Sequence, residues 1–274
     1  MFFLNSARIR SVKISAVLIT FNEEKNIERA IRSVQWADEI LVVDSESADR
    51  TREIAASLSA KIIVQKWLGF SKQKQFAVDS AAHDWIFSLD GDEIVSDQLR
   101  AEILQLKNSE FTSDGYKIPR LSFYMNRAIR YGGWYPDWQL RLFNRKKARW
   151  KDVLIHESVK MNDGARVGKL RGDIFHYSVE NFAHHHRMIG ERYAPLAARR
   201  MFADGKRTSR LKIASAGLTT FIQSYFLKLG FLDGFAGFCI ARFAAHHAFL
   251  KHLMLWELQN ETQTSKTETG YFID

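Results

Sequence analysis

The sequence predicts an α/β fold in which a mostly parallel sheet is flanked by helices. Short apolar runs alternate with helical patterns over residues 14–107, as in repeated βα units. Each predicted strand but one ends in a polar cluster, and a basic, aromatic helical region begins after residue 180. With 274 residues, 46% of them hydrophobic, the chain can build one large packed domain with an appendage. The composition excludes a disordered or collagen-like protein.

The first element is a buried strand at 14–19, followed by a helix at 24–34 whose apolar residues share one face. The same cycle then repeats, with predicted strands at 40–43, 61–64 and 85–89 and predicted helices at 48–58 and 71–81. Residues 108–178 break the alternation with two prolines, Gly132-Gly133 and many aromatics. We expect loops and mixed strands there that cover one edge of the sheet.

The last third of the chain is helical and carries most of the positive charge. Residues 181–258 contain 11 Lys and Arg against 4 Asp and Glu, in a chain with a formal net charge of +9. The longest charge-free stretch, 213–227, has 15 residues, short of the roughly 20 that a spanning helix needs. The single cysteine, Cys239, excludes a disulfide framework and CxxC zinc sites.

Three strand-end loops carry the polar residues on which chemistry can depend. They are residues 20–23, 44–47 and 90–93. Because parallel strands point their carboxyl ends to one edge, and ligands bind beyond that edge, we expect the three loops to converge on a site.

Asp90-Gly91-Asp92 is the most informative of these loops. Two carboxylates separated by a glycine suit Mg²⁺ or Mn²⁺, which complete their ligand shells with water and substrate phosphates. The alternative is an acidic turn before a helix that starts near Ser96. No GxGxxG or GxxxxGK[ST] motif occurs, so a diphosphate has to be held by a metal and side chains.

Asp44, Asn22 and Glu23 each allow two interpretations. A carboxylate at position 44 can accept from a base or a ribose hydroxyl, or it can cap the helix that begins near Ala48. Asn22 and Glu23 are either ligand contacts or helix-start residues. The consecutive histidines 184–186 cannot share a metal because neighbouring helical residues point about 100° apart. His156 and His176 can complete a metal shell, touch a diphosphate or be structural.

Four segments together resemble the amino-terminal part of family 2 glycosyltransferases, which have the GT-A fold. They are ISAVLITFNEEKNIERAIRSV, DEILVVDSESADRT, GFSKQKQFAVDSA and WIFSLDGDE, in the order and spacing of that family. The resemblance implies that the nucleoside is held by Thr20, Phe21, Asn22, Glu23 and Asp44. It also implies that Asp90 and Asp92 bind a divalent metal on the diphosphate, with Lys74 reaching the nucleotide from the other side.

The second half of the chain resembles the bacterial lipopolysaccharide core glucosyltransferases of the same family. The resemblance rests on YGGWYPDWQLRLFNRKKARW, LIHESV and LKLGFLDGFAGFCIA. It implies that glucose passes from UDP-glucose to an inner-core heptose with inversion. Asp137 occupies the place of the catalytic base, although Pro136 replaces the first residue of the usual Glu-Asp pair. Glu157 is the second candidate base.

Simpler interpretations of these residues remain. Asp137 can be a surface turn acid, and Glu157 can form a strand-end ion pair with His156. Arg141 is expected either to clamp a phosphate or to lie in solvent. Residues 1–180 then form the glycosyltransferase domain, with a nucleotide half at 12–107 and an acceptor half at 108–180. Residues 181–258 form a basic aromatic extension, and 259–274 a flexible tail.

The extension places Phe and Leu beside Lys and Arg at helical spacing, which favours docking on an anionic membrane surface. A homodimer interface and ordinary core packing are the alternatives. We therefore expect a cytoplasmic protein, peripheral at the inner face of the bacterial inner membrane, with a lipid-linked glycan acceptor. A polyprenyl phosphate or another cell-envelope glycan is the alternative acceptor.

Two other classes fit the sequence less well. A nucleotidyltransferase needs a Gly-rich loop near the first strand, and TFNEEKN has no glycine. A nucleic-acid binder suits the sequence pI of about 9.6, but its stacking aromatics would lie on an exposed sheet rather than at helical spacing. We therefore expect no nucleic-acid partner.

Overall fold

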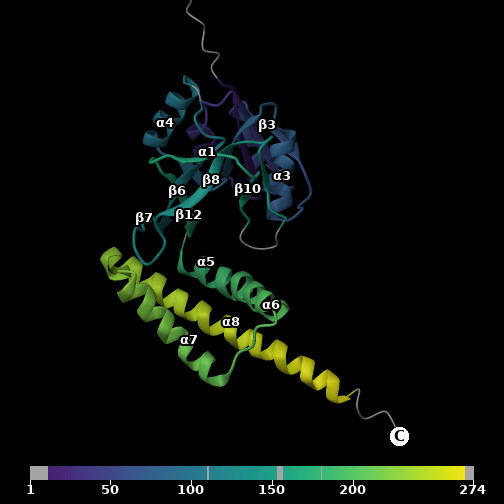
Figure 1. Ribbon diagram of the computed structural model, residues 1–274, viewed down its shortest axis with the longest axis vertical. Helices are drawn as coiled ribbons and strands as arrows, with labels where there is room; N and C mark the ends of the chain where they lie inside the picture. The colour runs from purple at the N-terminus through teal and green to yellow at the C-terminus, as the bar shows by residue number, and fades with distance from the viewer. Residues whose placement is uncertain (1–11, 110, 153–156, 180, 269–274) are drawn as a thin grey trace, which may run out of the picture. The chain divides into compact units, whose positions relative to one another are not determined.

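The chain forms two compact units (Figure 1). The computed structural model describes residues 12–109, 111–152, 157–179 and 181–268, the side chains of 262–268 excepted. The sheet unit comprises residues 1–121 and 136–176, and the helical unit comprises residues 122–135 and 177–274.

Four parallel strands form the first half of the sheet, which confirms the predicted α/β pattern. They are β1 (Ile14–Thr20), β2 (Glu39–Asp44), β3 (Lys61–Val64) and β4 (Trp85–Asp90), in the order β3-β2-β1-β4. Every residue of β1 is buried, as in the middle of a parallel sheet whose two faces are both covered. Thr20 pairs with Asp44, and Ile19 with Asp90, so β1, β2 and β4 end at one edge.

Helices cover both faces of these strands and divide the core into two clusters. Leu18 packs with residues of α1 (Ile27–Ser33), α2 (Thr51–Ser57) and α4 (Asp97–Lys107). Val17 packs on the opposite side with residues of α3 (Phe70–Ser80). Successive side chains of β1 thus point to opposite faces of the sheet and pack in different clusters, as in any pleated strand.

Both α1 and α2 begin three residues later than the sequence pattern predicts. Glu24 and residues 48–50, predicted to form the first helical turns, instead take part in hydrogen bonds across the two loops. The Ala48 N–H donates to Asn22 Oδ1 at 2.9 Å, and the Glu24 N–H donates to Asp49 Oδ2 at 3.1 Å. The loops are therefore fixed by each other before either helix starts.

The second half of the sheet is mostly antiparallel, in agreement with the predicted mixed strands. It contains β5 (Glu93–Val95), β6 (Gly115–Tyr124), β7 (Arg127–Ala128), β8 (Asp137–Asn144), β11 (Val167–Lys169) and β12 (Ile174–Val179), while β9 (Ala148–Trp150) and β10 (Val159–Met161) form a separate pair. β8 lies antiparallel to both β4 and β6, and β12 antiparallel to β5. These pairings bring Arg120 opposite Asp137, and His176 opposite Glu93.

The helical unit contains four α-helices among the residues that are described. They are α5 (Phe182–Arg187), α6 (Ala194–Ala203), α7 (Arg210–Ile222) and α8 (Gly234–Glu268), with π turns at Met188–Tyr193 and Gln223–Leu227 and a 3₁₀ turn at Gly230–Asp233. The chain turns back between α7 and α8, near Gly230 and Gly234, and the two helices run side by side (Figure 1). Gly234 has a φ of +61°, which a glycine adopts without strain.

Helix α8 continues past Leu258, where the sequence pattern predicted a flexible tail. No glycine or proline interrupts the chain between Gly237 and Gly270. The Gln259 side chain also holds this part of α8 against the segment before α7. It accepts from the Thr208 N–H at 2.6 Å and donates to the Thr208 carbonyl at 3.3 Å. Over the described residues, no helix combines the length and the apolar character that crossing a membrane requires.

Candidate active site

The loops after β1 and β2 interlock at the carboxyl edge of the sheet, as predicted. The Asn22 N–H donates to Ser47 Oγ at 2.8 Å, and Thr20 Oγ1 donates to Asp44 Oδ2 at 3.1 Å. Asn22 adopts a positive φ of 55°, which asparagine tolerates better than most residues. The backbone at this edge is thus held by side chains of the neighbouring loop.

The Asp90-Gly91-Asp92 loop joins them, so all three predicted loops converge. A β-carbon added to Gly91 would lie 3.0 Å from Glu23 Cγ and 3.1 Å from Thr20 Cγ2. A larger residue at position 91 would therefore push the acidic loop away from the first loop. The glycine lets the two loops approach each other without a shift of these side chains.

Asp90 is held by two cations. Lys74 Nζ lies 2.9 Å from Oδ1, and Arg141 Nη2 lies 3.0 Å from Oδ2. Burial alone would raise the pKa of Asp90, but the charges of Lys74 and Arg141 outweigh it and hold that pKa well below its usual range. Asp90 is therefore an anion whose position is fixed from α3 and from β8.

Asp92 pairs with an imidazole instead. His176 Nε2 lies 3.2 Å from Asp92 Oδ2. Burial opposes ionisation of both groups, yet their mutual attraction lowers the pKa of Asp92 and raises the pKa of His176. The buried Nδ1 of His176 has no hydrogen-bond partner among the described residues.

Asp92 and His176 fit a divalent cation that keeps open positions. Within the described ranges, no three carboxylate, imidazole or thiol side chains gather closely enough to enclose an ion. Mg²⁺ and Mn²⁺ do not need such a cage, because water and phosphate oxygens complete their shells. A carboxylate with 26% of its side chain exposed, beside one imidazole, is a partial shell of this kind.

Arg141 and Lys74 place positive charge in the same site. Arg141 is only 2% exposed, and its Nε and Nη1 groups have no partner in the described part of the chain. Lys74 Nζ also lies 3.5 Å from Glu157 Oε1 and 4.9 Å from the centre of the Trp150 ring. Unpaired buried N–H groups of an arginine are suited to bind a phosphate oxygen.

A chain of ion pairs leads from Asp90 to Asp137. Glu93 Oε1 accepts from Arg141 Nη2 at 2.7 Å and from Arg120 Nη1 at 3.1 Å. Arg120 in turn donates to Asp137 Oδ2 through Nη2 at 2.7 Å and through Nε at 3.0 Å. Both candidate bases thus belong to one electrostatic network, Asp137 through Arg120 and Glu157 through Lys74.

The other predicted residues lie as follows. Asp44 has no exposed surface and accepts from the backbone N–H and hydroxyl of Ser47, so it shapes its loop. It does not cap a helix, because α2 begins at Thr51 with Arg50 at its N-cap position. Phe21, by contrast, is 58% exposed at the same edge. His156 lies outside the described residues, and His176 is the histidine beside the acidic loop.

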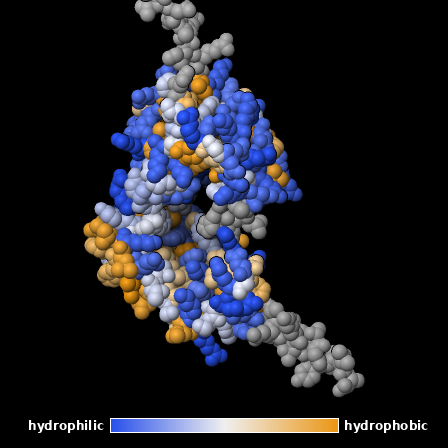
Figure 2. All heavy atoms as spheres, in the orientation of Figure 1, coloured by the Kyte–Doolittle hydropathy of each residue, from blue (hydrophilic) through white to orange (hydrophobic). Residues whose placement is uncertain are grey.

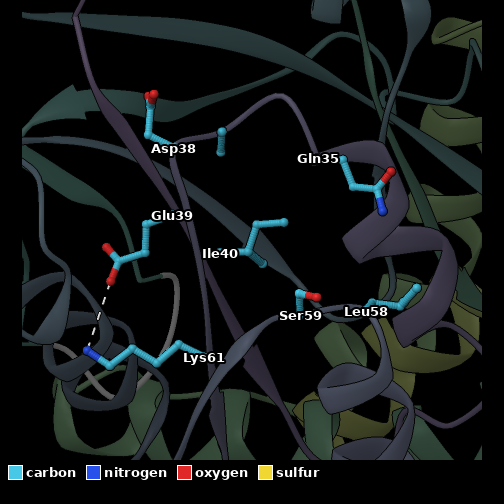
Figure 3. Close-up of a pocket in the computed structure, with 8 residues that line it drawn as sticks. Gln35, Asp38, Glu39, Ile40, Leu58, Ser59 and Lys61 are labelled. Atoms are coloured by element: carbon cyan, nitrogen blue, oxygen red, sulfur yellow. Dashed lines mark ion pairs between the residues drawn. The ribbon is translucent and has the colours of Figure 1, made fainter.

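A pocket at the opposite edge of the sheet does not share these features. It has a volume of about 550 Å³ and lies at the start of β2 and β3 (Figure 3). Its charged residues already support the fold, since Asp38 accepts from the Ile14 N–H and binds Lys107, and Glu39 accepts from Ser15 and binds Lys61. We therefore place the site at the carboxyl edge.

Two residues of the site were not assigned from the sequence. Glu93 follows the acidic pair directly, but nothing in its position shows that it is fully buried between two arginines. Arg120 reaches Asp137 only because β6 and β8 pair in antiparallel register past a bulge at Tyr116 and Lys117. An alternation of polar and apolar residues around Arg120 is the only sequence signal available.

Comparison with known proteins shows the family of this chain. Residues 15–171 match the family model for glycosyl transferase family 2. An uncharacterized glycosyltransferase of Rickettsia typhi is 33% identical over 94% of this chain and 92% of its own length. A lipopolysaccharide core biosynthesis glycosyltransferase of Rhizobium meliloti is 26% identical over 91% of this chain and 94% of its own.

Solved structures show a weaker likeness. The structure of Staphylococcus aureus TarS residues 1–349 in complex with UDP-GlcNAc is 14% identical, with a TM-score of 0.45 over 93% of this chain and 92% of that one. The family model covers more than half of the chain, and the Rickettsia relative covers nearly all of it. The chain therefore belongs to glycosyl transferase family 2, is a glycosyltransferase, and has the GT-A fold of that family.

Proposed function

We propose that this protein transfers a hexose, glucose, from UDP-glucose to a heptose of the lipopolysaccharide inner core, with inversion. The observation that carries the proposal is the convergence of three strand-end loops at one edge of the sheet, where Asp90 lies beside Lys74 and Arg141, and Asp92 lies beside His176. The Rhizobium relative, named for lipopolysaccharide core biosynthesis over its whole length, supports the acceptor class.

The donor is held at the carboxyl edge. The first loop, at residues 20–23, and Asp44 below it would form the nucleoside site, while Arg141 and Lys74 would face the diphosphate. Asp90, Asp92 and His176 would hold Mg²⁺ or Mn²⁺, with His156 as a further candidate. When bound, the cation neutralises charge that develops on the leaving diphosphate.

Inversion needs one base to take the proton of the acceptor hydroxyl, whereas glycoside hydrolysis needs two carboxyl groups around the bond. Asp137 suits this role better than Glu157. Its side chain is 36% exposed, and both hydrogen bonds from Arg120 go to Oδ2, so that Oδ1 is not bound by the arginine. Glu157 instead lies beside Lys74, on the side of the site where the donor phosphates would bind.

A panel of UDP-, GDP- and dTDP-sugars tests the donor assignment. Ligands that bind the folded state raise the apparent melting temperature by mass action. We expect UDP-glucose to give the largest rise in a thermal-shift assay, and the rise to shrink when the divalent cation is chelated. An equal response to all three nucleotides, or one that chelation leaves unchanged, would contradict the proposal.

The helical unit supports the second part of the proposal, that the enzyme works at an anionic membrane surface on the cytoplasmic side of the inner membrane. Figure 2 shows hydrophobic residues gathered where α7 ends and α8 begins. We call this the apolar face; its exposed members are Leu218, Ile222, Phe226, Leu227, Leu229, Phe231, Leu232, Phe235 and Phe238.

The charges around the apolar face fit anionic lipid. Residues 205–256 contain seven Lys and Arg but one acid, Asp233, which is buried and accepts from the backbone N–H groups of Arg130 and Tyr131. Apolar side chains among basic ones, with no exposed acid, are the composition of helices that lie in an anionic bilayer surface. An enzyme bound to such a surface would meet a lipid-linked acceptor in the same membrane.

Replacing Leu227 or Phe235 with glutamate is expected to weaken binding to phosphatidylcholine–phosphatidylglycerol vesicles by about tenfold or more, because apolar contact is lost and a like charge is added. Co-sedimentation measures the bound fraction. Val64→Glu in the sheet unit changes a residue that is 50% exposed and serves as the control. If the parent is a dimer that these variants split, and vesicles do not bind it, the apolar face is a dimer interface instead.

A further inference from the structure

We infer that Arg120 is a positioning residue for the transfer reaction and that, together with Gln139, it orients Asp137. Through its ion pair with Glu93, Arg120 also fixes Asp137 relative to Arg141 and Asp90 on the donor side of the site. The inference rests on the proposed role of Asp137 as the base. It assigns functions to Arg120, Gln139 and Glu93.

The hydrogen bonds leave Asp137 one place to receive a proton. Arg120 donates twice to Oδ2, from Nε at 3.0 Å and from Nη2 at 2.7 Å, while Gln139 Nε2 donates to Oδ1 at 2.7 Å. A carboxylate oxygen accepts about two hydrogen bonds, so Oδ2 is filled and Oδ1 keeps one acceptor position. The acceptor hydroxyl is therefore directed to Oδ1.

Glu93 holds the guanidinium of Arg120 from the side opposite Asp137. It is fully buried, and its Oε1 lies 3.1 Å from Arg120 Nη1. Burial opposes the charge of Arg120, but Glu93 and Asp137 together raise its pKa, so the guanidinium stays protonated and its fork stays in place.

The stability of the fold does not by itself explain why five charged side chains are linked in this site. Asp137, Arg120, Glu93, Arg141 and Asp90 alternate in sign and lie on β8, β6, β5 and β4, with Glu93 and Arg141 almost completely buried. Buried ion pairs often stabilise a fold no better than apolar residues of the same size. Charged groups that are buried together next to one accessible carboxylate are more typical of a functional site.

A double-mutant cycle tests the inference. Arg120→Met and Asp137→Asn are each expected to lower kcat for transfer by about 10²- to 10⁴-fold, which is the range of one general base. The KM for the UDP-sugar should change by less than about threefold. Because Arg120 acts through Asp137, the double variant should be no slower than Asp137→Asn alone.

Two further variants guard against a folding artefact. Arg120→Lys keeps the charge but not the two-pronged contact, and should give an intermediate kcat with the melting temperature of the parent. Arg149→Met makes the same chemical change as Arg120→Met at an exposed position of β9 and should leave kcat unchanged. If Arg120→Met does not fold, Arg120→Lys replaces it in the cycle.

The outcomes separate this inference from the proposed function. If the losses of Arg120→Met and Asp137→Asn multiply in the double variant, Arg120 acts independently of Asp137 and the inference is overturned while the base remains. If Asp137→Asn turns over at the parental rate, the base assignment fails, and the inference fails with it.

Discussion

Replacing Asp92 with alanine is expected to reduce sugar transfer by at least about 10³-fold while the protein remains folded. The substitution removes one anionic ligand of the proposed metal site, and a loss of about 4 kcal/mol of transition-state stabilisation corresponds to that factor. Asp92 has His176 as its side-chain partner and lies partly exposed on a loop, so the core should be unaffected. Release of UDP from UDP-glucose in the presence of acceptor measures the effect.

Binding measurements on the same variant separate metal loss from general damage. Calorimetry should show that Mn²⁺ strengthens UDP binding to the parent but not to Asp92→Ala. Asp97→Ala, in the exposed first turn of α4, removes a nearby acid outside the site and should behave like the parent. Full transfer activity in Asp92→Ala, with an unchanged response to Mn²⁺, would remove the metal role of this loop.

Replacing Asp137 with asparagine is expected to lower kcat by about 10²- to 10⁴-fold and leave UDP-glucose binding unchanged. Asparagine has nearly the same shape but cannot take the proton of a hydroxyl at neutral pH. The rival reaction, transfer to a polyprenyl phosphate, uses an acceptor oxygen that is already ionised and needs no base. Steady-state kinetics with a heptose acceptor and with a polyprenyl phosphate therefore distinguish the two.

The effect of Asp137→Asn needs a control variant in which another aspartate is changed to asparagine. Asp163→Asn changes an exposed acid in the turn between β10 and β11 and should keep the parental kcat. Unchanged turnover in Asp137→Asn would favour the polyprenyl phosphate acceptor. A loss in Asp137→Asn matched by an equal loss in Glu157→Gln would leave the choice of base to the pH dependence of kcat.

The parallel half of the sheet was predictable because burial on both faces makes its strands continuous apolar runs. β3 lies at the predicted residues, and β1 and β4 end one residue later than predicted. The convergence of their loops followed from strand direction alone. The starts of α1 and α2 were wrong by three residues, since loop-to-loop hydrogen bonds replaced the first helical turn.

The acceptor side of the site was predictable only in part. Asp137 was found by resemblance, but its contact with Arg120 depends on a register between antiparallel strands that includes a bulge. The contact of His176 with Asp92 depends on β12 pairing with β5, about 80 residues away along the chain. A local sequence pattern indicates which face of a sheet a residue lies on, but not which residue of a distant strand it pairs with.

A crystal structure of the protein with UDP and Mn²⁺ tests the central claim most directly. We expect the nucleotide at the carboxyl edge, beside the loop at 20–23, and the ion bound by Asp90, Asp92 and His176 with diphosphate oxygens completing its shell. A nucleotide bound elsewhere, with Asp92 still paired to His176 and no ion between them and the phosphates, would contradict the account.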